Sequence, residues 1–110
     1  MEAIVLTDDD LKRLETRFGP VVRQMGPWYS DGVFGYASVP LAAVEKAAET
    51  LENPNLLDAL PRLRTPERTK TFLELLENFG SVLAERIAAA YRDFPYLSHP
   101  SVLMNAKRPL

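Results

Sequence analysis

The sequence predicts one small, mainly α-helical domain, a bundle of three to five helices, and three observations support this prediction. The chain has 110 residues, the length of a single hydrophobic core. Hydrophobic residues make up 46% of it and recur at three- and four-residue steps over most of its length. Nine prolines, a larger share than globular proteins usually have, divide these amphipathic stretches into segments. We therefore expect a helical domain over residues 1–94 and an extended C-terminal arm over residues 95–110.

Composition argues against several classes of protein. No apolar run approaches the ~20 residues of a membrane span, and residues 1–6 are too short for a secretory signal. The chain has no cysteine, which rules out disulfides, a cysteine zinc site and a cysteine nucleophile. We expect no membrane association and a cytoplasmic or virion-associated location.

The first helix is predicted to begin after Thr7, a good N-cap that three aspartates follow at positions 8–10. Acidic residues in a first turn face the positive end of the helix dipole. The apolar stripe that follows continues in phase past Gly19 and Pro20, so we predict one kinked helix instead of two separate pieces. This stripe consists of Leu11, Leu14, Phe18, Val21, Val22 and Met25.

An aromatic segment follows at residues 28–36, where four of the ten aromatic residues gather after Gly26 and Pro27. The Asp31-Gly32 dipeptide inside it is typical of a type I′ turn and predicts a short hairpin. A lone two-stranded hairpin is marginal in water, so it would need a helix face or residues 3–6 as a third strand. Without such support the segment is an aromatic loop.

Prolines also bound the next two predicted helices. Pro40 lies near the first position of one helix, and Pro54 ends it. Asn55 is predicted to cap a short helix that Pro61 limits. The first helix has Leu41, Val44, Ala48 and Leu51 on one face and Glu45, Glu49 and Glu52 on another, and the second carries Leu56, Leu57 and Leu60.

The clearest helix start is Thr65-Pro66-Glu67, which combines a cap, a proline at the first position and an acid in the first turn. The apolar stripe after it keeps its phase through Gly80, so we predict one helix of about 28 residues despite the cost of a glycine. A stripe this wide is typical of the central helix of a bundle. It consists of Phe72, Leu76, Phe79, Leu83, Ile87, Ala90 and Phe94.

Residues able to carry out catalysis are few. His99, the only histidine, has no acidic neighbour in the sequence to hold it as a base. Aspartates 8–10 lack the ligand spacing and glycine of a calcium loop, and Glu74 and Glu77 lack the histidines of a carboxylate-bridged metal site. The sequence also contains no glycine-rich phosphate loop. We predict that the chain is not an enzyme and has no metal or cofactor.

The formal net charge of -2 hides a division, because residues 1–60 carry -5 and residues 61–110 carry +3. A basic patch precedes and opens the longest predicted helix; it consists of Arg62, Arg64, Arg68 and Lys70. Three interpretations stay open: solvated side chains, a patch that docks on an acidic surface such as a second copy of the chain, or nucleic-acid binding. A short helix, a turn and a second helix here resemble a helix-turn-helix, although four basic residues neutralise few phosphates.

Two segments are predicted to contact a partner, the aromatic segment and the arm. Tryptophan and tyrosine on an irregular loop are common interface hot spots, although aromatic residues also build cores and stack on unpaired bases. The predicted partner-binding residues are Trp28, Tyr29, Phe34, Tyr36, Tyr96, Leu97, Val102, Leu103 and Met104.

These features together predict a non-enzymatic structural or adaptor subunit that acts through protein–protein contacts, with another protein or with copies of itself. In outline, a small helical bundle with an extended C-terminal arm resembles the adaptor proteins that join the head and tail of phages, which implies a virion component. The likeness carries no residue-level motif. The alternatives are a small nucleic-acid-binding regulator that uses the basic patch and a protein inhibitor of a partner enzyme.

Overall fold

The computed structural model describes residues 2–30 and 32–93, so the predicted arm at residues 95–110 lies outside the described part. The described chain is mainly helical, as predicted, and also contains a three-stranded antiparallel sheet. In chain order the elements are β1 (Ala3–Thr7), α1 (Asp8–Phe18), the 3-10 helix η1 (Pro20–Gln24), β2 (Trp28–Ser30), β3 (Gly35–Pro40), α2 (Leu41–Leu51), α3 (Pro54–Ala59), the 3-10 helix η2 (Leu60–Arg64) and α4 (Arg68–Asp93).

The sheet has the strand order β1-β3-β2, with both pairs antiparallel. The predicted hairpin is therefore confirmed, and β1 supplies the third strand that the sequence offered as one of two supports. The hairpin loop is longer than a type I′ turn, because the last paired residues are Ser30 and Gly35 and residues 31–34 lie between them. Asp31 itself lies outside the described residues.

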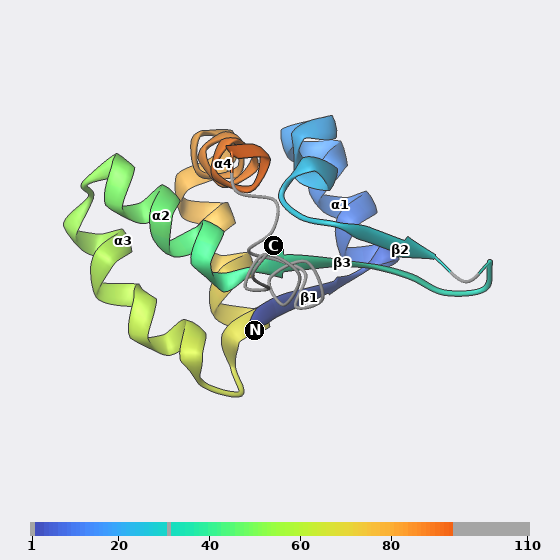
Figure 1. Cartoon of the computed structure of the whole chain (residues 1–110), viewed down its shortest axis with the longest axis horizontal. Coiled ribbons are helices and arrows are strands. Elements are labelled where there is room, and N and C mark those ends of the chain that lie inside the picture. The colour runs from blue at the N-terminus through green and yellow to red at the C-terminus, as the bar shows by residue number, and fades with distance from the viewer. Residues whose placement is uncertain (1, 31, 94–110) are drawn as a thin grey trace, which may run out of the picture.

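The core lies on one side of this sheet. Successive residues of a strand point to opposite faces, and the inner-face residues Ile4, Leu6, Ala37 and Val39 are each at most 1% exposed. Helices α1, α2 and α4 lie on this side of the strands (Figure 1). The central place predicted for the longest helix is confirmed, because α4 packs against α2, η1, η2 and β1.

Helix α1 begins as predicted and ends earlier than predicted. Thr7 and Asp10 form a reciprocal capping box, in which each backbone N–H donates to the other side chain at 3.2 Å. The prediction of one kinked helix is wrong, because Gly19 has φ 88° and the chain restarts as a 3-10 helix at Pro20. Val22 of that 3-10 helix is still fully buried, which explains why the apolar stripe kept its phase.

Helix α3 is capped by a different asparagine from the one predicted. The Asn53 side chain accepts hydrogen bonds from the backbone N–H groups of Asn55 and Leu56, at 2.9 and 3.3 Å. Pro54 then occupies the first helical position, where its missing N–H is not needed. The preceding helix α2 ends at Leu51, and its C-cap Glu52 has a left-handed backbone (φ 55°) that turns the chain.

Helix α4 is interrupted, so the prediction of a single unbroken helix is wrong. Gly80 has φ 64° and ψ -150°, a backbone conformation outside the helical region and suited to glycine, and it separates residues 68–79 from residues 81–93. The helix also begins at Arg68, two residues later than predicted. Thr65 instead forms a turn, in which its hydroxyl accepts from Glu67 N–H at 3.2 Å.

Candidate binding surface

The outer face of the sheet is the side that no described helix covers. It includes Val5, Thr7, Tyr29, Tyr36 and Ser38, which alternate with the inner-face residues along the strands. Val5 is 51% exposed and Tyr36 is 42% exposed. The solvated face of an antiparallel sheet normally carries polar residues. A valine and two tyrosines there mark this face as a candidate binding surface.

The two tyrosines of the outer face form a cross-strand pair. Tyr29 on β2 lies directly opposite Tyr36 on β3, and their rings stack with centroids 5.1 Å apart and planes 28° from parallel. Cross-strand aromatic pairs stabilise a sheet and limit the motion of both rings. The pair is therefore a preformed platform.

A groove runs across this platform. One hollow of about 550 Å³ is lined by Val5, Thr7, Asp8, Asp9, Val33, Phe34, Gly35 and Tyr36. A second of about 350 Å³ is lined by Tyr29, Ser30, Phe34 and Tyr36. Because the two hollows share Phe34 and Tyr36, we treat them as one surface and call it the aromatic groove. The hairpin that carries it extends beyond the helices, and Phe34 near its tip is 76% exposed (Figure 1).

One end of the aromatic groove carries negative charge. Asp8 forms ion pairs with Lys12 at 3.2 Å and with Arg23 at 3.1 Å. Hydrogen bonds from Arg23 and then Lys12 hold the pKa of Asp8 below its usual value, although burial opposes the shift. Asp9 is exposed and has no cationic partner among the described residues. At this end the groove therefore presents a carboxylate that no cation of the described residues neutralises.

Trp28 lies outside the aromatic groove. It pairs with Ala37 of the inner face, and the guanidinium of Arg23 lies 4.6 Å from its ring centre. Arg23 is held in turn by Glu15, to which its Nε donates at 2.6 Å. The indole also covers Gly35 so closely that a Cβ there would come within 2.3 Å of the ring. Trp28 therefore anchors the hairpin to η1.

The structure brings together three of the aromatic residues predicted to bind a partner, Tyr29, Phe34 and Tyr36, and leaves Trp28 apart. The groove also contains Val5 and Asp9, which the sequence did not assign to a binding surface. The signal for Val5 was the alternation within residues 3–7, which becomes readable only once that segment is known to be a strand. Asp9 was identified only as an acidic residue of a helix start. The other predicted contacts, Tyr96, Leu97, Val102, Leu103 and Met104, lie outside the described residues.

The basic patch is partly neutralised within the chain. Arg64 donates to both carboxylate oxygens of Glu45, at 2.7 and 2.9 Å, and this contact raises the pKa of Arg64. Arg68 donates to the backbone carbonyl of Ala3 at 3.3 Å, which ties α4 to the edge of β1. The remaining two members of the patch are exposed and have no ion pair among the described residues. Two arginines of the patch thus have structural partners.

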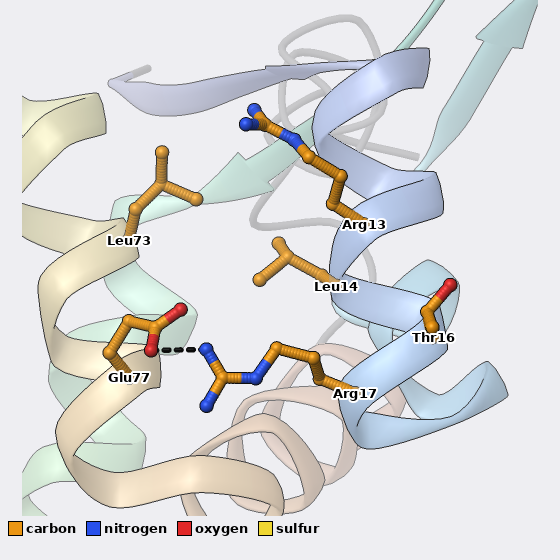
Figure 2. Close-up of a pocket in the computed structure, with 6 residues that line it drawn as sticks. All are labelled: Arg13, Leu14, Thr16, Arg17, Leu73 and Glu77. Carbon is orange, nitrogen blue, oxygen red and sulfur yellow. Dashed lines mark hydrogen bonds and ion pairs between the residues drawn. The ribbon is translucent and has the colours of Figure 1, made fainter.

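A further cavity of about 440 Å³ lies between α1 and α4 (Figure 2). Leu14 and Leu73 extend into it from the two helices, and an ion pair between Arg17 and Glu77 crosses it. Arg13, at its other end, is paired with an aspartate of its own helix. Since each charged side chain of the lining already has a partner, the cavity offers little to orient a polar ligand.

Comparison with known proteins gives no match to a protein family, to a curated protein or to a solved structure. Within residues 2–30 and 32–93, no group of three or more acidic or histidine side chains could hold a metal ion. No helix in the same part of the chain is long and apolar enough to cross a membrane. The aromatic groove is therefore the candidate functional site of the described chain.

Proposed function

We propose that the chain is a non-enzymatic structural or adaptor subunit of a protein assembly and that it holds a partner protein through the aromatic groove. The observation that supports this proposal is the outer face itself, where Val5 and Tyr36 are about half exposed beside a stacked tyrosine pair. Rings already held in place lose little conformational entropy on binding, and aromatic residues supply much of the energy of protein interfaces. The outline likeness to phage head–tail adaptors makes a virion one setting for such a subunit.

The basic patch supports nucleic-acid binding less well. A patch that binds DNA must offer its cations to phosphates, and each phosphate neutralised adds to the salt dependence of binding. Arg64 and Arg68 are already held by Glu45 and by the carbonyl of Ala3. Only two cations of the four have no such partner in the described part of the chain, so protein binding through the aromatic groove is the better supported proposal.

The proposal can be tested by capture with matched variants. The full chain is immobilised and exposed to a lysate of its source, beside a Tyr36→Thr variant and a Glu49→Ser variant. Threonine keeps a residue that suits a strand and removes the ring, whereas Glu49 is an exposed residue of α2 outside the groove lining. We expect one protein to be retained by the wild type and by Glu49→Ser and to be lost from Tyr36→Thr.

The captured protein is then purified and mixed with the full chain, and the mass of the complex is measured by light scattering. A complex of defined stoichiometry that Tyr36→Thr fails to form agrees with the proposal. A strictly monomeric chain that captures the same proteins with and without the Tyr36 ring contradicts it.

A further inference from the structure

The outer face has the size of a single peptide segment. The five residues of β1 span ~17 Å and three strands lie ~10 Å apart from first to last, so the face covers on the order of 200 Å². A stable interface between two folded proteins buries about 800 Å² on each partner. One extended segment, laid across the strands, would cover the face that is available.

The residues that line the aromatic groove indicate which kind of peptide segment would complement it. Its floor is apolar and aromatic, from Val5 on β1 to Tyr29 on β2. At the β1 end stands the carboxylate of Asp9, which no cation of the described residues neutralises, while the charge of neighbouring Asp8 is already matched by Lys12 and Arg23. The complementary segment has an apolar stretch followed by a cation.

A segment of this composition is present in the chain itself, outside the described residues. Val102, Leu103 and Met104 are consecutive apolar residues, and Lys107 and Arg108 follow them. In an extended chain the four steps from residue 103 to residue 107 span ~13 Å. Tyr29 is separated from the β1 end of the groove by two strand spacings, ~10 Å. If Leu103 lies against the tyrosines, Lys107 therefore lies beside Asp9.

The place where the described chain ends puts this segment within reach. Arg92, one residue before the end of α4, lines a cavity together with Phe18 and Pro20 at the far end of α1. Helix α1 has 11 residues and leads from there to Asp8 over ~16 Å. The eight residues 94–101, which connect α4 to the apolar residues 102–104, can span ~26 Å when extended. A segment tethered in this way has an effective concentration in the millimolar range at the groove.

We propose that the aromatic groove is occupied by the C-terminal segment of the same chain, with the apolar residues 102–104 against Tyr29 and Tyr36 and the basic pair 107–108 beside Asp9. This inference rests on the proposed function, because it takes the groove as the binding surface and adds the means of its regulation. A partner that uses the groove has to displace the segment, so the partner's own docking peptide shares its composition: an apolar stretch followed by lysine or arginine.

The experiment is paramagnetic broadening of amide signals in the full chain. Because the chain has no cysteine, Asn105→Cys gives a unique site for a nitroxide label. We expect the label to weaken the amide signals of Val5, Tyr29 and Tyr36 to less than half of their intensity in the reduced, diamagnetic sample. A Glu49→Cys label on the exposed side of α2 is the matched control, and it should leave this set of signals unchanged.

Groove variants then test the contacts. In the labelled chain, Tyr36→Thr or Asp9→Lys should restore the signals of Val5 and Tyr29. Asp9→Lys combined with Lys107→Glu and Arg108→Glu should weaken them again, because the charges are exchanged. Asp9 is an exposed residue of α1, so this variant keeps the test usable if Tyr36→Thr does not fold. Broadening confined to other surfaces, or broadening that Asp9→Lys and Tyr36→Thr both leave unchanged, overturns the proposal.

A mixed sample identifies the source of the segment. It contains nitroxide-labelled chain at natural isotope abundance together with ¹⁵N-enriched chain that carries no nitroxide. An undiminished spectrum of the ¹⁵N chain supports docking within one chain, and weakened groove signals in this mixture overturn it in favour of a second copy. The measurement needs no partner protein. It can therefore succeed when capture by the groove fails, and it can fail when capture succeeds, so the two proposals are tested separately.

Discussion

Adjacent residues of each strand point to opposite faces of the three-stranded sheet, and the two faces have different surroundings. On β1, Ile4 and Leu6 are completely buried beneath the helices, whereas Val5 between them is 51% exposed. On β3, Ala37 is 1% exposed and its neighbour Tyr36 is 42% exposed. Both faces carry apolar or aromatic side chains, yet only the inner one is covered by described helices.

The comparison separates residues needed for folding from residues available for binding. Inner-face side chains stabilise the fold because their burial removes apolar surface from water, at roughly 25 cal/mol per Å². The outer face gains less in this way, because Val5 and Tyr36 each keep about half of their surface exposed. A substitution on the inner face should therefore change the free energy of unfolding, and one on the outer face should change binding.

The largest expected effect is that of Leu6→Ala. Leu6 is fully buried, so its truncation removes transfer free energy and leaves a cavity, and we expect a loss of about 2–5 kcal/mol in the free energy of unfolding. The matched variant on the other face, Val5→Ala, should cost less than about 1 kcal/mol. Urea denaturation at equilibrium measures both. Equal losses for the two variants would contradict the difference in burial between Leu6 and Val5.

The second effect concerns the helix that covers the inner face. Gly80→Ala places a side chain at φ 64° and ψ -150°, where a residue with a Cβ costs about 1–3 kcal/mol. The nearest atom to the new Cβ is Cε1 of Phe18 at 3.7 Å, an ordinary contact, so backbone strain is the main cause. Urea denaturation should show this loss while the amide signals of Val5 and Tyr36 keep their positions. A more stable Gly80→Ala variant would show that α4 prefers to be straight.

Local chemistry made the start of α1 and the hairpin predictable. The cap at Thr7 depends on residues within one turn, and the aromatic segment with its Asp31-Gly32 dipeptide depends on neighbours in sequence. The breaks at Gly19 and Gly80 were not predictable from the apolar stripe. Buried residues such as Val22 keep the helical spacing even though a residue with positive φ interrupts the helix before them. Apolar spacing therefore indicates which residues are buried and does not indicate whether the helix is continuous.

The candidate site was predictable only in part, because residue types can be read from the sequence and strand register cannot. Tyr29 and Tyr36 stood out by residue type, but their stacking needs the register in which β2 faces β3. Trp28 looked equivalent to them in sequence, and it differs because a one-residue step along a strand moves a side chain to the other face. Asp9 could not be assigned to the groove until β1 was placed beside β3.

A smaller effect is expected where the two faces meet, at Arg23. This side chain joins Asp8 at 3.1 Å, Glu15 at 2.6 Å and the ring of Trp28, and Arg23→Gln should cost roughly 1 kcal/mol at neutral pH. The pKa of Asp8 is lowered in the folded state, so its contribution is present above its usual value of 3.8 and is lost as the pH falls through the folded value. The difference in melting temperature between wild type and variant should therefore shrink below about pH 4. A difference that stays constant down to pH 2 would contradict the assigned pairing.

The smallest expected effect is that of Gly35→Ala, which probes the exposed end of the inner face. The added Cβ would come within 2.3 Å of the Trp28 ring, and the ring can turn away because it is the free end of a flexible side chain that is already 39% exposed. We expect the fluorescence of this single tryptophan to change, because the ring leaves its place beneath Arg23, with a stability loss of less than about 1 kcal/mol. Ser30→Ala, at the opposed position on β2, is the matched control and should leave the emission unchanged. A loss in stability as large as that of Leu6→Ala would place Trp28 within the core, and the boundary between the two regions would then lie further along the hairpin.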